Sequence, residues 1–130
     1  AIAACKEAGA RRALPLAVSG AFHTNLMADA AKELRAFAQD LTVHAPTMPV
    51  YTNVTGQKLE VTDLPAHLEK HMCSPVRWKT LVSNGMKDGL MTGVEIGPGK
   101  TLAGFARKIS KELTVRTAET PEDVAAIAGA

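Results

Sequence analysis

The sequence predicts an α/β layer structure with at least partly parallel strand pairing. Short strand-like runs alternate with helical segments, Gly-rich turns separate them, and the helical segments carry apolar residues at steps of three and four. Only about four short strands can be counted. Because parallel sheets that are buried on both faces normally contain more, we expect the 130 residues to supply part of a larger sheet.

The first part of the chain is predicted to hold a helix, a strand and a second helix. The first helix ends near Glu7, and the apolar run 13–18 is typical of a strand. With no initiator Met before that helix, we expect the chain to begin partway through a helix. The second helix spans 25 to about 40, with Thr24 or Asn25 as its cap. Its predicted inner face consists of Leu26, Ala30, Leu34, Phe37 and Leu41.

Turn and cap residues place the remaining elements. Asp63 can cap a helix whose first turn holds Pro65, where a missing N–H is harmless. Ser74-Pro75 restarts a helix, and Gly97-Pro98-Gly99 makes a tight loop between a strand and a helix. The expected strands are 50–54, 90–96 and 115–117, and the expected helices are 64–72, 74–88, 100–111 and a last turn from Pro121.

Composition and charge are those of a globular domain and disfavour several classes of function. Hydrophobic residues make up 46% and charged residues 22%, and the net charge is +2. The adjacent basic pairs at 11–12 and 107–108 lack interleaved aromatic residues, so no nucleic acid partner is expected. No apolar run approaches the ~20 residues that span a bilayer, so no membrane partner is expected. With no visible signal peptide, and with Cys5 and Cys73 far apart, we expect a cytoplasmic protein.

His23 is the first candidate for catalysis. It follows an apolar run and a small-residue turn, at the point where the next helix begins. Ligands of α/β sheets bind at the carboxyl ends of strands, and a helix N-terminus favours the neutral imidazole that a general base needs. A lone histidine beside an apolar run is also commonly a core or capping residue. From the residues alone, both interpretations stay open.

Three other patterns resemble functional motifs, but each lacks a feature that the motif requires. His67 and His71 are one helical turn apart, but the glutamate that must follow the first histidine of HExxH is missing, so we expect a solvated helix face. The stretch 95–101 ends in Gly-Lys-Thr, but Val94 stands where a phosphate-binding loop needs glycine. No serine lies in a Gly-x-Ser-x-Gly turn, and a helix end disfavours a thiolate at Cys73. We therefore expect no metal, no cofactor and no nucleophile.

Four motifs cover nearly the whole chain. They read RALPLAVSGAFHT at 12–24, PVYTNVTG at 49–56, SPVRW at 74–78 and VEIGPGKTL at 94–102. In this order they resemble the C-terminal part of the malonyl-CoA:acyl carrier protein transacylase family of type II fatty acid synthesis. Each motif alone is weak, but together they are highly specific.

The resemblance implies that the chain is a portion of an enzyme built from two subdomains. Residues 1–20 would be the last helix and strand of a ferredoxin-like small subdomain, and 21–130 the C-terminal half of an α/β-hydrolase-like large subdomain. The family's serine nucleophile would lie upstream, so this chain alone is expected to be inactive. The implied partners are malonyl-CoA, the acyl carrier protein and the missing N-terminal portion that carries the serine.

The resemblance also implies roles for three residues. His23 matches the family's catalytic histidine, which takes the serine proton so that serine attacks the malonyl thioester, and then helps the phosphopantetheine thiol attack the acyl-serine. His71 occupies a position, usually glutamine, whose backbone carbonyl orients that imidazole. Phe22 matches a residue that lines the acyl pocket, and its ring gives a mild preference for malonyl over methyl-branched units, about 1–3 kcal/mol. An acyltransferase domain of a polyketide synthase and a non-catalytic half-domain binding module stay open as alternatives.

Overall fold

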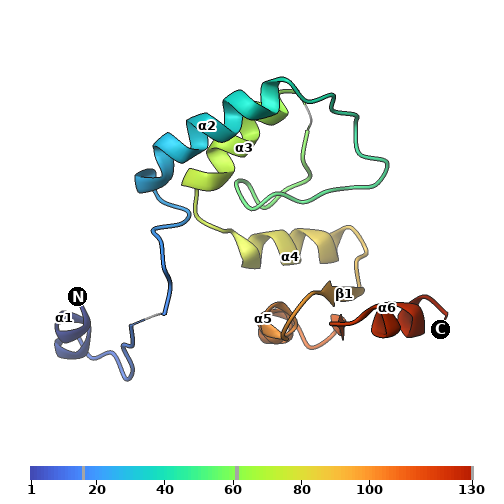
Figure 1. Ribbon diagram of the computed structural model, residues 1–130. Helices are drawn as coiled ribbons and strands as arrows, with labels where there is room; N and C mark the ends of the chain where they lie inside the picture. The colour runs from blue at the N-terminus through green and yellow to red at the C-terminus, as the bar shows by residue number, and fades with distance from the viewer. Residues whose placement is uncertain (16, 61, 130) are drawn as a thin grey trace.

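The computed structural model describes residues 1–15, 17–60 and 62–129. Helices dominate it, and a small sheet lies near the C-terminus (Figure 1). In chain order the elements are α1 (Ile2–Glu7), the 3₁₀ turn η1 (Asn25–Met27), α2 (Ala28–Gln39), α3 (Leu64–Cys73), α4 (Trp78–Lys87), β1 (Thr92–Ile96), α5 (Thr101–Ile109), β2 (Thr114–Ala118) and α6 (Pro121–Ala128).

The two strands form a parallel pair joined by a helix. β1 and β2 pair in register from Thr92↔Thr114 to Ile96↔Ala118, and α5 makes the crossover that a parallel connection requires. The predicted α/β class and parallel pairing are confirmed in this unit. Among the described residues the sheet has two strands, fewer than a parallel sheet normally contains.

The core of the described region is small and lies between α4, α5 and the sheet. Val82, Ala106 and Leu113 are buried, and larger side chains pack around them. Packing of α4 against α5 accounts for most of this cluster. The partly buried members are Trp78, Leu81, Met86, Ile109 and Val115.

The pair α2 and α3 forms a second packed group, side by side in Figure 1. The predicted inner face of α2 is wrong: Leu26 is 83% exposed and Phe37 is 67% exposed. Instead the buried residues of α2 are Ala31 and Ala38, whose small side chains allow α2 and α3 to approach closely. The ion pair between Arg35 on α2 and Glu69 on α3, 2.8 Å from N to O, lies at the same contact.

Two predicted strands are not formed. Residues 13–15 and 17–18 are irregular, and residue 16 of that predicted strand lies outside the described residues. The segment 50–54 makes a single antiparallel bridge, Tyr51↔Lys58. A strand exists only when a neighbour satisfies its backbone groups, and apolar composition alone does not supply that neighbour. Pro15 additionally removes one N–H from the first segment.

The starts of η1 and α3 follow the caps that the sequence predicts. Thr24 Oγ1 accepts a hydrogen bond from the N–H of Leu26 at 3.3 Å, and Asp63 Oδ1 accepts one from the N–H of Ala66 at 2.9 Å. Pro65 lies in the first turn of α3, as predicted. None of the helices described here is both long and apolar enough to cross a membrane.

The predicted helix start at Ser74-Pro75, in contrast, is wrong: α4 begins at Trp78. Ser74 is extended, with ψ 146°, because a residue before proline is disfavoured in the helical conformation.

Candidate active site

His23 is held in an unusual backbone conformation at the entrance to η1. Among the residues that the structure describes, it is the one non-glycine residue with a positive φ, 63°. Its backbone N–H donates a hydrogen bond to the carbonyl of Met72 at 3.1 Å. A left-handed residue of this kind costs on the order of 1–3 kcal/mol, and such strain clusters at functional sites. The contact with Met72 helps to hold His23 in this conformation.

The imidazole of His23 meets the neighbouring carbonyl. Its Nδ1 lies 3.2 Å from the carbonyl oxygen of His71. Because a carbonyl oxygen only accepts, this contact is a hydrogen bond when Nδ1 carries the proton, and Nε2 then keeps its lone pair. The ring is partly buried rather than enclosed. The arrangement is chemically able to accept a proton at Nε2.

The two carbonyls that hold His23 belong to the last turn of α3. Carbonyls in the last turn of a helix lack partners within the helix and carry the negative end of its dipole. They are therefore free to accept the hydrogen bonds from His23. The position of α3 is fixed by the Asp63 cap at its start and by the Arg35–Glu69 pair along its length. The last turn of α3 therefore holds both the backbone and the ring of His23 in place.

Phe22 lies directly before His23 and is 60% exposed. A methyl group placed on Gly20 would come within 3.0 Å of Phe22 Cε2, so the ring rests against the Gly20 backbone. One face of the ring is therefore supported while the side chain as a whole stays accessible. The role of Phe22 in an acyl pocket remains a prediction.

His67 has a partner that sequence analysis missed. Its Nε2 lies 2.7 Å from Oγ1 of the buried Thr52, so the prediction of a solvated helix face is wrong for this residue. The contact connects α3 to the segment that precedes it. For His71, which is exposed, the prediction of an exposed position is correct. Within the described ranges, no group of three His, Cys, Asp or Glu residues is placed to hold a metal ion. The signal that could have found the contact is Thr52 itself, a polar residue within a predicted strand.

The environment of His71 affects its own titration. The imidazoles of His71 and His23 have centroids 5.8 Å apart, with an angle of 59° between their planes. Partial desolvation of its ring lowers the pKa of His71 below its ordinary value, and the charges of His23 and then His67 lower it further. A proton is therefore harder to place on His71 than on a solvated histidine.

The loop after β1 is closed by Glu95. Its Oε1 accepts a hydrogen bond from the N–H of Leu102 at 3.0 Å, and its Oε2 accepts one from the N–H of Ala103 at 2.7 Å. Gly97 and Gly99 make the turn with φ values of 127° and 91°. The carboxylate thus occupies the place at the start of α5 where a phosphate would bind. The sharp turn expected from the sequence is present, and Glu95 is a further residue that sequence analysis missed.

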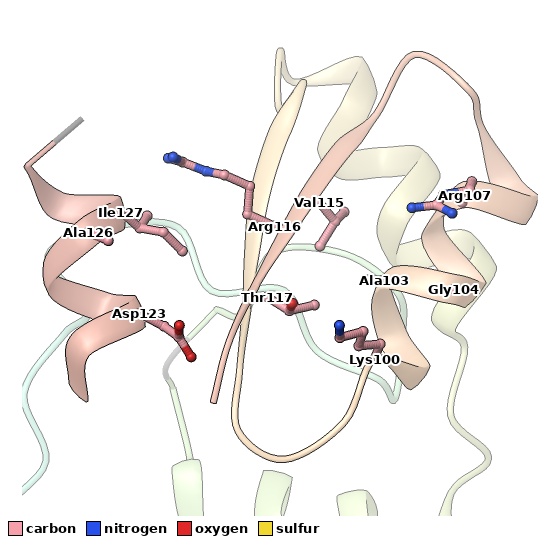
Figure 2. A pocket seen from close by; sticks show the side chains of 10 residues that line it. All are labelled: Lys100, Ala103, Gly104, Arg107, Val115, Arg116, Thr117, Asp123, Ala126 and Ile127. Carbon is pink, nitrogen blue, oxygen red and sulfur yellow. The ribbon is translucent and has the colours of Figure 1, made fainter. Parts of the chain in front are cut away.

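A pocket of about 540 Å³ with mixed polar and apolar walls lies between α5, β2 and α6 (Figure 2). In Figure 2, Thr117 stands between Asp123 of α6 and Lys100 at the start of α5. The pKa of Asp123 is lowered mainly by backbone N–H groups of Glu119 and Thr120, and least by the charge of Lys100. None of the predicted site residues lines this pocket. It is separate from the His23 site.

Comparison with known proteins connects this geometry to a family. No family profile matches the chain. The malonyl CoA-acyl carrier protein transacylase of Haemophilus influenzae is 41% identical over 114 residues, which is 87% of this chain and 36% of that protein. The chain is homologous to the malonyl CoA-acyl carrier protein transacylases. The resemblance inferred from its four motifs is thereby confirmed.

Solved structures of these transacylases share the fold. The crystal structure of the Xanthomonas oryzae transacylase matches with a TM-score of 0.87 and 36% identity, covering 97% of this chain and 40% of that one. A malonyl-transacylase solved in complex with a type II PKS acyl-carrier protein matches with a TM-score of 0.86 and 33% identity. The match covers 98% of this chain and 42% of that one. The chain thus spans about two fifths of the length of the transacylases that it matches.

Proposed function

We propose that this chain acts as the C-terminal portion of a malonyl-CoA:acyl carrier protein transacylase, with His23 as its general base. The observation that carries the proposal is the contact between His23 Nδ1 and the His71 carbonyl at 3.2 Å, which directs the lone pair of Nε2 away from α3. The names of the homologous proteins supply the reaction class. A cytoplasmic location remains a prediction from the sequence.

The proposed reaction has two half-steps. In the first, Nε2 of His23 takes the proton of a serine hydroxyl, the serine oxygen bonds to the malonyl carbonyl carbon, and coenzyme A leaves as a thiol with the proton from the imidazolium. In the second, Nε2 takes the proton of the carrier's phosphopantetheine thiol, whose sulfur bonds to the same carbon. The carbon–oxygen bond of the acyl-serine then breaks, and the imidazolium returns the proton to serine. The contact of Nδ1 with the His71 carbonyl holds the ring in the same orientation in both steps.

The serine is proposed to come from an N-terminal portion that covers the sheet unit. Ile96 on β1 is 74% exposed, and an apolar groove between α4, β1 and α5 is open. Parallel sheets occur almost only with both faces covered, so a partner for this surface is physically reasonable. The groove is lined by apolar side chains that include Trp78, Leu81, Leu90, Val94 and Leu102.

We further propose that residues 1–20 close a ferredoxin-like small subdomain and that 21–130 form half of an α/β-hydrolase-like large subdomain. In support, α1 lies at the end of an extended segment, apart from the other helices (Figure 1), and residues 1–12 are all exposed. Phe22, exposed beside His23, is proposed to line the acyl pocket and to disfavour methyl-branched units.

A chimaera tests the proposal. This chain replaces the matching part of the Haemophilus influenzae relative, and transfer of the malonyl group is measured with carrier proteins from fatty acid and from polyketide synthesis. We expect activity from the chimaera and none from the chain alone. His23→Asn should lower kcat/KM at least 10²-fold, the usual contribution of a general base. His44→Asn, in the loop after α2, serves as the matched control. A His23→Asn chimaera as active as this control would refute the assignment.

A further inference from the structure

The last turn of α3 differs from that of the other α-helices in what its carbonyls accept. At the ends of α1, α2, α4, α5 and α6, the backbone N–H of the residue that follows the helix returns to carbonyls of the last turn. Ser74, which follows α3, makes no such bond within the described ranges. The carbonyls of His71 and Met72 accept instead from Nδ1 and from the backbone N–H of His23.

Pro75 accounts for this difference. In an α-helix each carbonyl accepts from the N–H four residues later, so the competitor for the His71 carbonyl is the N–H of residue 75. That residue is proline, which has no N–H. A proline also disfavours the helical conformation in the residue before it, and Ser74 is extended. The helix therefore ends where the His71 carbonyl has no competing donor from its own backbone.

The chain that follows Pro75 leaves α3 and takes another partner. The N–H of Arg77 donates to the carbonyl of Asn53 at 3.1 Å, and α4 begins at the next residue, Trp78. The donor of Arg77 is thus used on a different segment. The break between α3 and α4 supports the contact with His23 because it directs the following backbone away from the last turn of α3.

We propose that Pro75 is a positioning residue for His23, because its missing N–H reserves the His71 carbonyl for Nδ1 of His23. That contact requires the proton on Nδ1, and Nε2 then keeps the lone pair with which a general base acts. The inference rests on the proposed function for its effect on catalysis, whereas the tautomer of the ring is a property of the chain itself.

NMR of the ¹⁵N-labelled chain of 130 residues tests the tautomer directly, at about pH 8 where the imidazole is neutral. Pro75→Ala supplies the missing N–H and allows Ser74 to become helical. Pro65→Ala is the matched control, because an N–H in the first turn of α3 has no carbonyl to compete for. The wild type and Pro65→Ala should carry the His23 proton mainly on Nδ1. In Pro75→Ala, the ratio of the Nε2–H to the Nδ1–H tautomer should rise about two- to tenfold, the usual contribution of one hydrogen bond.

An unchanged tautomer ratio in Pro75→Ala would overturn the proposal. A semisynthetic chain with N-methylalanine at position 75, ligated at Cys73, separates the missing N–H from the ring of proline and decides the matter even if Pro75→Ala does not fold. It should keep the wild-type tautomer. A shift towards Nε2–H in this chain would show that the missing N–H is not what reserves the carbonyl.

The chimaera tests the consequence for catalysis. In Pro75→Ala, kcat should fall by the factor by which NMR shows the Nδ1–H tautomer to be depleted, while KM for malonyl-CoA changes by less than about twofold. An unchanged kcat despite a shifted tautomer would refute the positioning role. An inactive parent chimaera together with a shifted tautomer in Pro75→Ala would refute the proposed function and leave the reserved carbonyl standing. An active, His23-dependent chimaera with an unshifted tautomer would do the reverse.

Discussion

The substitution Glu95→Gln probes the connection between the sheet and α5. The Glu95 carboxylate lies on β1 and accepts hydrogen bonds from the backbone N–H groups of Leu102 and Ala103, at 3.0 and 2.7 Å. Both donors belong to the first turn of α5, where no carbonyl of the helix can serve them. A glutamine has nearly the same shape but only one accepting oxygen. The change therefore removes one hydrogen bond and the negative charge while keeping the volume.

The expected loss in the free energy of unfolding is about 2–4 kcal/mol. A hydrogen bond to a charged group contributes about 1.5–3 kcal/mol, and a negative charge at a helix N-terminus contributes a further 0.3–1 kcal/mol. The N–H that loses its acceptor faces the amide NH₂ of the new side chain, so the remaining geometry must shift to avoid two opposed donors. The partly buried position of Glu95 limits replacement by water.

Urea unfolding followed by circular dichroism at 222 nm measures the change. The wild type, Glu95→Gln and Glu33→Gln are compared, because Glu33 is an exposed glutamate on α2. The midpoint should fall for Glu95→Gln at an unchanged slope, and Glu33→Gln should stay within about 0.5 kcal/mol of the wild type. If Glu95→Gln also stays within about 0.5 kcal/mol, the carboxylate does not hold α5 as described.

Three further predictions concern stability. Gly56→Ala should destabilise the fold by about 2–4 kcal/mol, because φ is 71° and the new Cβ would lie 2.7 Å from Thr80 Cγ2. Gly104→Ala, inside α5 with open space around it, should stabilise by about 0.5–1 kcal/mol in the same urea assay. The pKa of Asp123 is lowered below its ordinary value of 3.8, chiefly by the N–H of Glu119. The Asp123 carboxylate therefore stabilises the folded state above pH 3.8, and this stabilisation disappears as pH falls through the lowered pKa. Asp123→Asn should therefore flatten the dependence of Tm on pH below about 4.

Features that depend on a few neighbouring residues were predictable from the sequence. The caps at Thr24 and Asp63, the proline in the first turn of α3 and the tight loop at 97–99 are all set by local hydrogen bonds or by allowed φ values. The parallel pairing of the sheet also followed from the order of strands and helices. Contact between His23 and the carbonyl of His71 was expected from the family resemblance, since no periodicity or spacing relates two residues 48 positions apart.

Features that depend on distant neighbours were not predictable. The run 13–18 has strand composition, but among the described residues it finds no ladder to join. α2 buries its alanines because α3 lies against that side, and a hydrophobicity pattern favours the larger Phe37 instead. Glu95 and His67 take partners on other elements, so each looked like an ordinary polar residue in the sequence. In each case the missing information was which element lies opposite.

The left-handed backbone of His23 also determines how variation at this position should be read. Valine, isoleucine and threonine are strongly disfavoured at a φ of 63°, whereas asparagine and aspartate tolerate it. In a saturation library, branched replacements would therefore disappear through misfolding before any chemistry is tested. Their depletion would carry no information about proton transfer. The comparison that does carry it is between histidine and asparagine, because both tolerate this backbone conformation.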